Sequence, residues 1–537
     1  MSDEVASQLT ADIQVSPNYK YLPSILDVLS PTCCARCILR FTGVQAPHIY
    51  SKTEMITEPE RKQLREGPLP GICSACLGLL EETMIGSARD PIQHRYEGKI
   101  NEMLSQELTQ TEAQFDDYTL AISLPPSLII RQYSIWYLLR QRTQGFNGDV
   151  PIIVEIKECL KWTLGRFLQD HRKMEFKFQS NFTVTLIVKN ESTNTEHEFL
   201  ADMKEKEGLQ KPKPQRLNKR RANGDNKKVM PEVSSNYVSK LLDDITFEKF
   251  KESSPIPPPP VTSECSLAVS LSHSPIYVAG RYIKYSRDIS QSPWVIDGVR
   301  KTQFSVEEIL AGPILPMFKA QGYKFMSAGR EDSDVRMTGR GRPFVLEIEN
   351  PKVTRVGDDV FRKIEHLHNS GAHSVESTLV KFVDLQIVPK GEVSKIKEGE
   401  QTKTKNYRAL VWISRSMTDE ELRAITERKD LVIDQKTPVR VLHRRTLAVR
   451  QKKIHSLGFE RINEHFIYLD LHTESGTYIK EFVHGDLGRT QPSFTSLLGC
   501  QTDILELDVT SVNLDFPSQV STEIPETTKA EIPHYLK

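Results

Sequence analysis

The chain has 537 residues, more than one hydrophobic core usually organises, so we expect roughly two to four domains. Lysine plus arginine number 71, as do aspartate plus glutamate, and this balance excludes a global field that would attract nucleic acid. The N-terminus lacks the basic and apolar regions of a secretory signal, and no apolar run approaches the roughly 18 residues of a membrane span. We therefore expect an intracellular protein, in the nucleus, the cytoplasm or both, without membrane contact.

Two cysteine pairs lie near the N-terminus, in the sequences PTCCARC and GICSAC. Cys34 and Cys37 form one pair, Cys73 and Cys76 the other, and two residues separate the cysteines of each pair. Four thiolates spaced in this way predict the closed tetrahedral shell of a structural zinc site, and buried or redox-active thiols are the alternative. Cys33 competes with Cys34 for the role, but the spacing of the second pair favours Cys34.

The next segment carries patterns of both secondary-structure types. Residues 118–141, YTLAISLPPSLIIRQYSIWYLLRQ, predict a strand, a proline turn and an apolar helix. Residues 181–190, NFTVTLIVKN, alternate apolar and polar side chains like a half-buried strand. We therefore expect residues 1–252 to form an α/β accessory domain that includes the zinc site.

Three segments have the composition of connectors or tails. Residues 204–228 are basic and poor in apolar side chains, which predicts a flexible insert, either solvated or used for RNA contact or a nuclear address. Residues 253–264, SSPIPPPPVTSE, predict a proline-rich linker between domains. Residues 517–537 have the composition of a disordered tail.

Residues 265–516 then predict a second domain. YRALVWIS at 407–414 and FIYLDLHT at 466–473 are typical of strands, whereas SVEEILAGPILPMFKAQ at 305–321 is typical of a helix. Strands with helices between them favour an α+β domain with a mixed or antiparallel sheet.

Basic side chains concentrate in two segments of this second domain. Residues 435–455 contain seven lysines and arginines, among them Arg444 and Arg445, and no acid. The sequence GRYIKYSR sets Arg281 and Lys284 beside tyrosines that could stack on unpaired bases. Either segment alone is more often a solvated face, but two in one domain favour binding to nucleic acid through the phosphates.

The stretch GREDSDVRMTGRGRPF, residues 329–344, sets Glu331, Asp332 and Asp334 among four arginines. A solvated loop of mixed charge is one interpretation. The other is a site in which a carboxylate acts as nucleophile, acid or base while arginines receive an anion. Spacing alone does not separate Asp332 from Asp334.

This stretch resembles the active-site motif of pseudouridine synthases, in which GR-x-D presents one aspartate. The chain resembles most the archaeal and eukaryotic tRNA pseudouridine(54/55) synthase family, through VAGRYIKYSRDISQSPWVIDG, KTKNYRALVW, DQKTPVRVLHRRTLAVR and GTYIKEFVHGDLGRTQPS. These matches cover most of residues 278–493 in order. The two cysteine pairs are similar to the zinc-binding accessory domain of this family, which is described with a THUMP-like RNA-binding element.

The resemblance implies a role for each matching position. Asp332 takes the place of the catalytic aspartate, and Tyr407 that of the tyrosine that stacks near the target base. Tyr478 and Lys480 match a motif with a substrate-contacting residue and a basic partner for the aspartate. We expect flanking arginines such as Arg330 to hold phosphates, and the other two acids of the loop to hydrogen-bond within it.

The implied activity is the isomerisation of uridine to pseudouridine at position 54, 55 or both of the tRNA T loop. We expect the protein to act as a monomer on the T arm of tRNA, with other structured RNA as a further possible substrate. The glycosidic bond breaks, the uracil turns, and a ring carbon joins the sugar, so no organic cofactor or redox equivalent is needed. A cation beside the aspartate favours its charged form. Flanking cations hold the backbone while the target uridine leaves its stack.

Two other functions compete with this one. A non-catalytic RNA-binding protein in small-RNA processing would use the same basic surface, although the presence of Asp332, Tyr407 and Lys480 favours an enzyme. A methyltransferase with a THUMP-like domain would need a glycine-rich cofactor loop after a strand, and only GRGR at 339–342 comes near that pattern.

Overall fold

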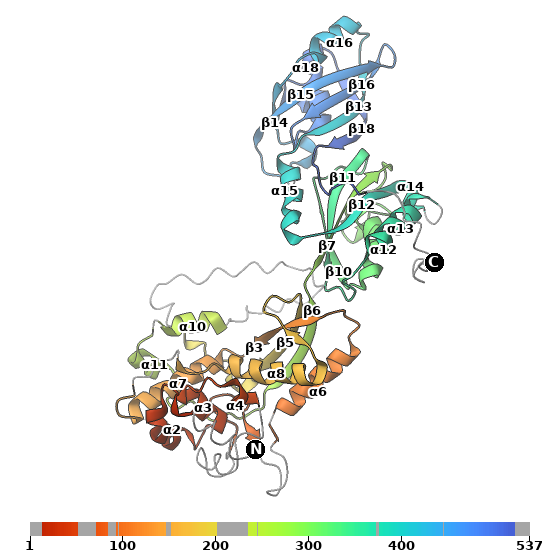
Figure 1. The fold of residues 1–537 in the computed structure, drawn as a ribbon. Helices are drawn as coiled ribbons and strands as arrows, with labels where there is room; N and C mark the ends of the chain where they lie inside the picture. Colours follow the sequence, from red (N-terminus) through yellow and green to blue (C-terminus); the bar gives the residue numbers. More distant parts are fainter. Residues whose placement is uncertain are drawn as a thin grey trace. The chain divides into compact units, whose positions relative to one another are not determined.

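Two compact units make up the fold of this chain in the computed structural model (Figure 1). The first unit comprises residues 1–111 and 115–272, and the second comprises residues 112–114 and 273–537. Each unit has its own sheet and its own set of buried apolar side chains.

The structure describes residues 13–51, 71–83, 93–94, 96–146, 152–200, 235–243, 245–371, 375–443 and 445–520. The expected basic insert at 204–228, Arg444 and most of the expected tail at 517–537 lie outside these ranges. Within them, no helix combines the length and the apolar character that crossing a membrane requires.

The first unit contains a four-stranded sheet in the order β4–β3–β5–β6. Its strands are β3 (Asp117–Ser123), β4 (Glu175–Phe176), β5 (Phe182–Lys189) and β6 (Ser266–His273). β3 runs parallel to both β4 and β5, and the long helical segment that follows β3 allows this pairing. Alternate side chains of β5 are buried, as the sequence pattern predicts. The parallel strands and their helices confirm the α/β character of this part.

Helices pack beside this sheet (Figure 1), and the unit also contains a separate two-stranded antiparallel pair, β1–β2. The elements are α2 (Leu22–Leu29), α3 (Ala35–Thr42), α4 (Pro47–Ser51), β1 (Glu82–Thr83), β2 (Gln93–His94), α6 (Glu97–Gln110), α7 (Ser127–Arg142), α8 (Ile156–Arg172), α10 (Ser235–Asp243) and α11 (Phe247–Ser253). The expected strand, turn and apolar helix at 118–141 are β3, a proline pair and α7. α7 packs the buried rings of Tyr133 and Tyr137 against Val238 of α10 and Phe250 of α11.

The proline-rich segment at 253–264 packs against the first unit, and this corrects the expected domain boundary. The hydroxyl of Ser134 donates to the carbonyl of Pro255 at 2.6 Å, and the guanidinium of Arg131 donates to the carbonyl of Pro259 at 3.0 Å. An extended proline-rich backbone leaves its carbonyls free, so neighbouring donors can bind it. The chain then supplies β6 to the same sheet, and the boundary falls between residues 272 and 273.

The second unit is built on a ten-stranded sheet in the order β12–β7–β11–β18–β13–β16–β15–β14–β17, with β10 also paired to β11. Its strands, together with the small β8–β9 hairpin, are β7 (Ile276–Lys284), β8 (Val295–Ile296), β9 (Val299–Arg300), β10 (Gly322–Ser327), β11 (Val335–Glu349), β12 (Val380–Val388), β13 (Lys405–Ile413), β14 (Leu431–Lys436), β15 (Val449–Arg461), β16 (Phe466–Thr473), β17 (Thr490–Gln491) and β18 (Thr502–Val512). β11 and β18 are parallel, whereas the other pairs in the sheet whose register is defined are antiparallel. This mixed sheet confirms the α+β class.

Helices cover this sheet and include the one predicted from residue 305. They are α12 (Val306–Phe318), α13 (Asp358–Asn369), α14 (Glu376–Leu379), α15 (Ser394–Gln401), α16 (Asp419–Thr426), α17 (Ile479–His484) and α18 (Phe494–Leu498). α12 begins at an N-cap, because the hydroxyl of Ser305 accepts from the backbone N–H of Glu308. The two expected strands are β13 and β16, which pair with each other directly.

Strand β18 sets the position of the acidic loop. Val335, at the start of β11, pairs with Leu507, and Tyr407 on the other flank of β18 pairs with Val509. The loop that precedes Val335 therefore lies across β18 from Tyr407. Between Met337 and Arg342 the register of β11 shifts.

The glycines of GRGR lie at this shift, within strand β11. A Cβ on Gly339 would lie 2.1 Å from the carbonyl oxygen of Thr510, and one on Gly341 would lie 2.5 Å from that of Tyr282. Both glycines also have positive φ angles, 62° and 82°. They serve a bulge in a strand, and this placement argues against the cofactor loop of a methyltransferase.

Candidate active site

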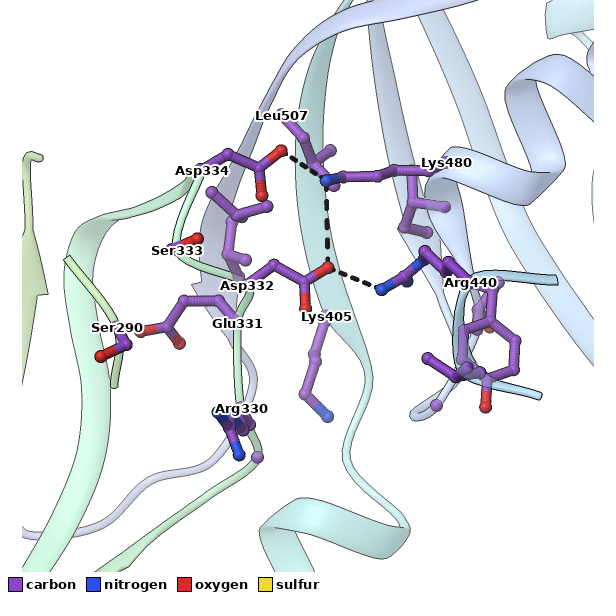
Figure 2. Close-up of a pocket in the computed structure, with 18 of the residues that line it drawn as sticks. Ser290, Arg330, Glu331, Asp332, Ser333, Asp334, Lys405, Arg440, Lys480 and Leu507 are labelled. Atoms are coloured by element: carbon purple, nitrogen blue, oxygen red, sulfur yellow. Dashed lines mark hydrogen bonds and ion pairs between the residues drawn. The ribbon is translucent and has the colours of Figure 1, made fainter. Parts of the chain in front are cut away.

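A pocket with a volume of about 1420 Å³ opens in the second unit. Its walls come from the acidic loop between β10 and β11, the first residues of β13, the segment after β14, and the turn before α17 (Figure 2). Six residues chosen from the sequence line it, namely Arg330, Asp332, Tyr407, Arg445, Tyr478 and Lys480.

Glu331 belongs to a buried network beneath the loop. Its carboxylate accepts from the Arg342 guanidinium at 2.8 Å and from the Tyr282 hydroxyl at 2.8 Å. Gln291 donates from its amide to Tyr282 at 2.8 Å and to the carbonyl of Gly329 at 2.9 Å. Because these buried groups satisfy one another's hydrogen-bonding capacity, the network holds the acidic loop in one conformation. Glu331 therefore hydrogen-bonds around the loop, as expected.

Lys284 holds the same loop from behind. Its ammonium, with a relative accessibility of 0%, donates to the carbonyls of Asp332 at 3.0 Å and Ser333 at 2.8 Å. Arg281, 2% exposed, donates to the carbonyl oxygens of Leu514 and Phe516 at 2.9 and 2.8 Å.

The RNA contact expected for Arg281 and Lys284 is therefore wrong. Their strand, β7, lies between β11 and β12 and is buried along nearly its whole length. Cationic side chains on such a strand satisfy backbone carbonyls inside the protein and are not available to a phosphate.

Asp332 presents its carboxylate to the pocket, with 41% of the side chain exposed. Arg440 donates to its Oδ2 from Nη1 at 2.8 Å, and Lys480 lies 3.9 Å from the same oxygen (Figure 2). Arg440 is held in turn by Glu481, 3% exposed, through an Nε–Oε1 distance of 2.7 Å. Asp332 thus has a fixed cationic partner on one side and open pocket on the other.

Lys480 pairs more closely with Asp334 than with Asp332. Its Nζ lies 2.5 Å from Asp334 Oδ2. Burial acts to raise the pKa of Asp334, but the hydrogen bond and charge of Lys480 outweigh it and lower that pKa. We expected Asp334 to hydrogen-bond within its own loop, but its carboxylate pairs instead with Lys480, a side chain of α17.

Arg440 is one residue of the site that the sequence analysis missed. It was visible only as one of seven cations in residues 435–455. A short 3₁₀ turn, Val439–Val441, brings it back to the acidic loop, which is more than a hundred residues away in the chain. No local pattern signals such a pairing.

Two aromatic residues from the motifs also reach the pocket. Tyr407 lies on β13, and burial raises its pKa to about 12, so its hydroxyl stays protonated at neutral pH. Tyr478 precedes α17, and its backbone N–H and C=O each bond at 2.9 Å to the side-chain amide of the buried Gln435. Gln435 thereby fixes the turn that carries Tyr478 and Lys480, and the sequence analysis missed this role as well.

Other basic side chains that line the pocket are Arg330, Arg445, Arg450 and Lys452, and His443 lies among them. Arg330 is exposed and forms no ion pair with the described residues. Two other arginines of its stretch, both partly exposed, already pair with acids, Arg336 with Asp508 at 2.7 Å and Arg340 with Asp384 at 3.3 Å. Within that stretch, Arg330 is the arginine best placed to receive a phosphate.

The four expected cysteines come together in the first unit. The sulfurs of Cys34, Cys37, Cys73 and Cys76 all lie within 4.8 Å of one another and are buried. The N–H of Leu80 donates to Cys76 Sγ at 3.4 Å, as backbone groups do around metal-bound thiolates. Four sulfur donors in this arrangement could hold a metal ion, and their number and type fit zinc.

Family comparisons match both units. Residues 277–513 match the model described as Pus10, C-terminal, and residues 73–269 match Eukaryotic Pus10, N-terminal. The tRNA pseudouridine synthase Pus10 of Xenopus laevis is 34% identical over 94% of this chain and 98% of its own length. Its counterpart in the archaeon Thermofilum pendens is 39% identical over 46% of this chain and 54% of its own length.

Among solved structures, a match is the "Crystal Structure of a Cbf5-Nop10-Gar1 Complex", with a TM-score of 0.24 and 17% identity over 43% of this chain and 48% of that chain. The sequence matches extend across both units and nearly the whole length of the Xenopus protein. The resemblance seen in the motifs is thereby confirmed. The chain belongs to the Pus10 family.

Proposed function

We propose that the protein is a tRNA pseudouridine synthase that isomerises uridine in the T loop, at position 54, 55 or both, with Asp332 as its catalytic carboxylate. The observation that carries this proposal is the position of Asp332. It is a half-exposed carboxylate, paired with Arg440 at 2.8 Å, in a pocket lined by several arginines and lysines. The names of the Pus10 relatives supply the reaction class.

The other two acids of the loop are committed elsewhere. Glu331 is buried against Arg342 at 2.8 Å, and Asp334 pairs with Lys480 at 2.5 Å. Asp332 remains as the carboxylate that can reach the sugar of a bound uridine. It acts either by bonding to C1′ or by taking a proton from the sugar. Arg440 holds it in one orientation for that step.

The rest of the pocket suits a nucleotide that has left its stack. Tyr407 offers an aromatic side chain to the base, and Arg330 and Arg445 offer charge to the flanking phosphates. The pocket volume of about 1420 Å³ leaves space for the detached uracil to turn. We expect the protein to act as a monomer on the T arm of tRNA.

We also propose that zinc occupies the four-cysteine cluster of the first unit. A metal with four protein ligands has no open position, so it stabilises this unit and takes no part in the reaction. We expect the first unit to provide a THUMP-like RNA-binding surface in addition to the metal site.

The direct test is to map pseudouridine in a tRNA transcript incubated with the purified protein. We expect modification at U54, U55 or both, and transcripts with cytidine at either position identify which. A transcript that stays unmodified while it binds tightly would contradict the proposal and favour a non-catalytic RNA-binding protein.

A further inference from the structure

Lys405 is a buried lysine whose side chain lines the active-site pocket. It begins β13 and precedes Tyr407 by two residues, so both side chains emerge on the same face of the strand. A Cβ on Gly329, three residues before Asp332, would lie 3.6 Å from Lys405 Cε. In Figure 2 the Lys405 side chain lies beside Asp332, and its ammonium is directed away from the Asp332 carboxylate, toward the side on which Arg330 lies.

The ammonium of Lys405 is incompletely satisfied in the protein. It donates to the hydroxyl of Ser475 at 3.1 Å and weakly to the carbonyl of Lys403 at 3.5 Å. No carboxylate in the described part of the chain forms an ion pair with it. The side chain is only 5% exposed, so water compensates little for the missing partner.

The charges around Lys405 add to this imbalance. Burial, together with the neighbouring cations Arg342 on β11 and Lys452 on β15, lowers its pKa to about 8, and Glu400 on α15 opposes this shift. A buried cation among cations is unfavourable until a negative charge arrives beside it. The exposed Arg330 and Arg445 can bind phosphates that stay outside the pocket. Lys405 is buried, so only a group that enters the pocket can reach its ammonium.

The proposed reaction creates such a negative charge. When the C1′–N1 bond of the target uridine breaks, its electron pair stays with the uracil and spreads over N1, O2 and O4. That pair later forms the C5–C1′ bond, and one proton moves from C5 to N1, so the sum is an isomerisation without a co-reactant. A cation fixed beside the uracil carbonyls lowers the energy of this intermediate.

We propose that Lys405 is a second catalytic residue, whose ammonium donates a hydrogen bond to a carbonyl oxygen of the detached uracil. A uracil packed on the ring of Tyr407 has its edge within reach of the Lys405 ammonium, because two residues at positions i and i+2 of a strand are about 6.8 Å apart. Lys405 transfers no proton in this step and stabilises charge only. The proposal rests on the proposed function.

The test compares Lys405→Met and Lys405→Arg with the wild-type protein in single-turnover pseudouridine formation and in tRNA binding. Lys405→Met should lower the rate constant by roughly 10²-fold or more, as loss of one preorganised donor does, while the dissociation constant for tRNA changes little. Lys405→Arg keeps a charge and should retain part of the rate. An unchanged rate, or a loss confined to tRNA affinity, would overturn the proposal.

The pH profile of kcat/KM separates catalysis from a structural role. Because protonated Lys405 is required and its pKa is about 8, wild-type activity should fall above that pH. In Lys405→Arg the fall should move to higher pH, since arginine stays charged. A fall that stays near pH 8 would belong to another group, such as Lys284, whose pKa burial also lowers to about 8, and would overturn the assignment. An inactive wild-type protein would contradict the proposed function itself.

Discussion

The acids of the loop share one chemistry, but their surroundings give them separate roles. Glu331 accepts from Arg342 and Tyr282 inside the protein. Asp334 is neutralised by Lys480. Asp332 lines the pocket as the other two acids do, but its partner is Arg440, which the buried carboxylate of Glu481 holds in place. Position, more than residue type, therefore distinguishes Asp332, the proposed catalytic acid, from its neighbours.

The first prediction concerns Arg440, which bridges Asp332 and Glu481 with two different nitrogens. Arg440→Gln should lower kcat by roughly 10- to 100-fold, because Asp332 loses its orientation. Arg440→Lys should restore little, since one ammonium cannot replace the two-point contact. Single-turnover rates measure both.

Arg415→Gln is the matched control for Arg440, because it breaks an exposed pair with Glu421 in the same unit. Its kcat should stay at the wild-type value. If Arg440→Gln changed only KM, the role of Arg440 would be RNA binding and not the positioning of Asp332.

For single residues, the sequence predicted which motif residues reach the pocket better than it predicted residues whose place depends on contacts with distant segments. Asp332, Tyr407, Tyr478 and Lys480 all line one pocket, as the motifs implied. Arg440 and Gln435 were missed because their partners come from distant segments.

Two cations were misread for a related reason. Lysine and arginine are usually exposed, so a basic segment is interpreted as surface. Arg281 and Lys284, however, lie on a buried strand with a neighbouring strand on each side. Strand order, which decides this, cannot be read from a local window.

At the scale of elements, the basic segment at 435–455 divides into parts with different tasks. Gln435, at the end of β14, fixes the turn before α17, and Arg440 reaches the acidic loop. His443, Arg445 and Arg450 then line the pocket before and along β15. The segment therefore combines side chains that fix the geometry of the site with those for which we propose RNA binding.

The second prediction tests the outer part of that segment. Arg444→Ala with Arg445→Ala should weaken tRNA binding and make its salt dependence shallower by roughly one to two units of slope, because each phosphate contact releases counterions. The rate of the bound complex should change little. Binding isotherms at several salt concentrations measure the slope.

Lys324→Ala is the control for this variant, because Lys324 is an exposed lysine paired with Glu347 and Glu349 on the neighbouring strand. It should leave affinity and slope unchanged. An unchanged slope in the double arginine variant would assign residues 444 and 445 to a solvated face.

At the scale of the whole molecule, the cysteine cluster lies in one unit and the pocket in the other. The regular spacing of the cysteine pairs made the cluster predictable from sequence. The boundary between the units was not predictable in this way. The proline-rich segment has the composition of a linker, yet its carbonyl oxygens accept hydrogen bonds from Arg131 and Ser134.

The third prediction follows from that cluster. The purified protein should contain close to one zinc per chain, and Cys73→Ser with Cys76→Ser should abolish its retention, because two of four thiolates are lost. Elemental analysis measures the metal. Full retention by the double variant would place the zinc elsewhere.

Thermal unfolding should report the loss in the first unit, since metal binding contributes to folding. Chelation should therefore damage the fold or RNA binding before it affects the isomerisation itself. A chelated protein that kept its fold and lost only the reaction would contradict a structural role for the metal.

The most direct test of the central claim is pseudouridine formation by Asp332→Asn beside Asp334→Asn. The asparagine at 332 keeps the shape of the side chain and removes the charge and the nucleophile, so product should fall below detection while fold and tRNA affinity persist. Asp334→Asn loses only its pair with Lys480 and should retain substantial activity. An active Asp332→Asn beside an inactive Asp334→Asn would move the catalytic role to Asp334, and activity in both would contradict the account of this loop.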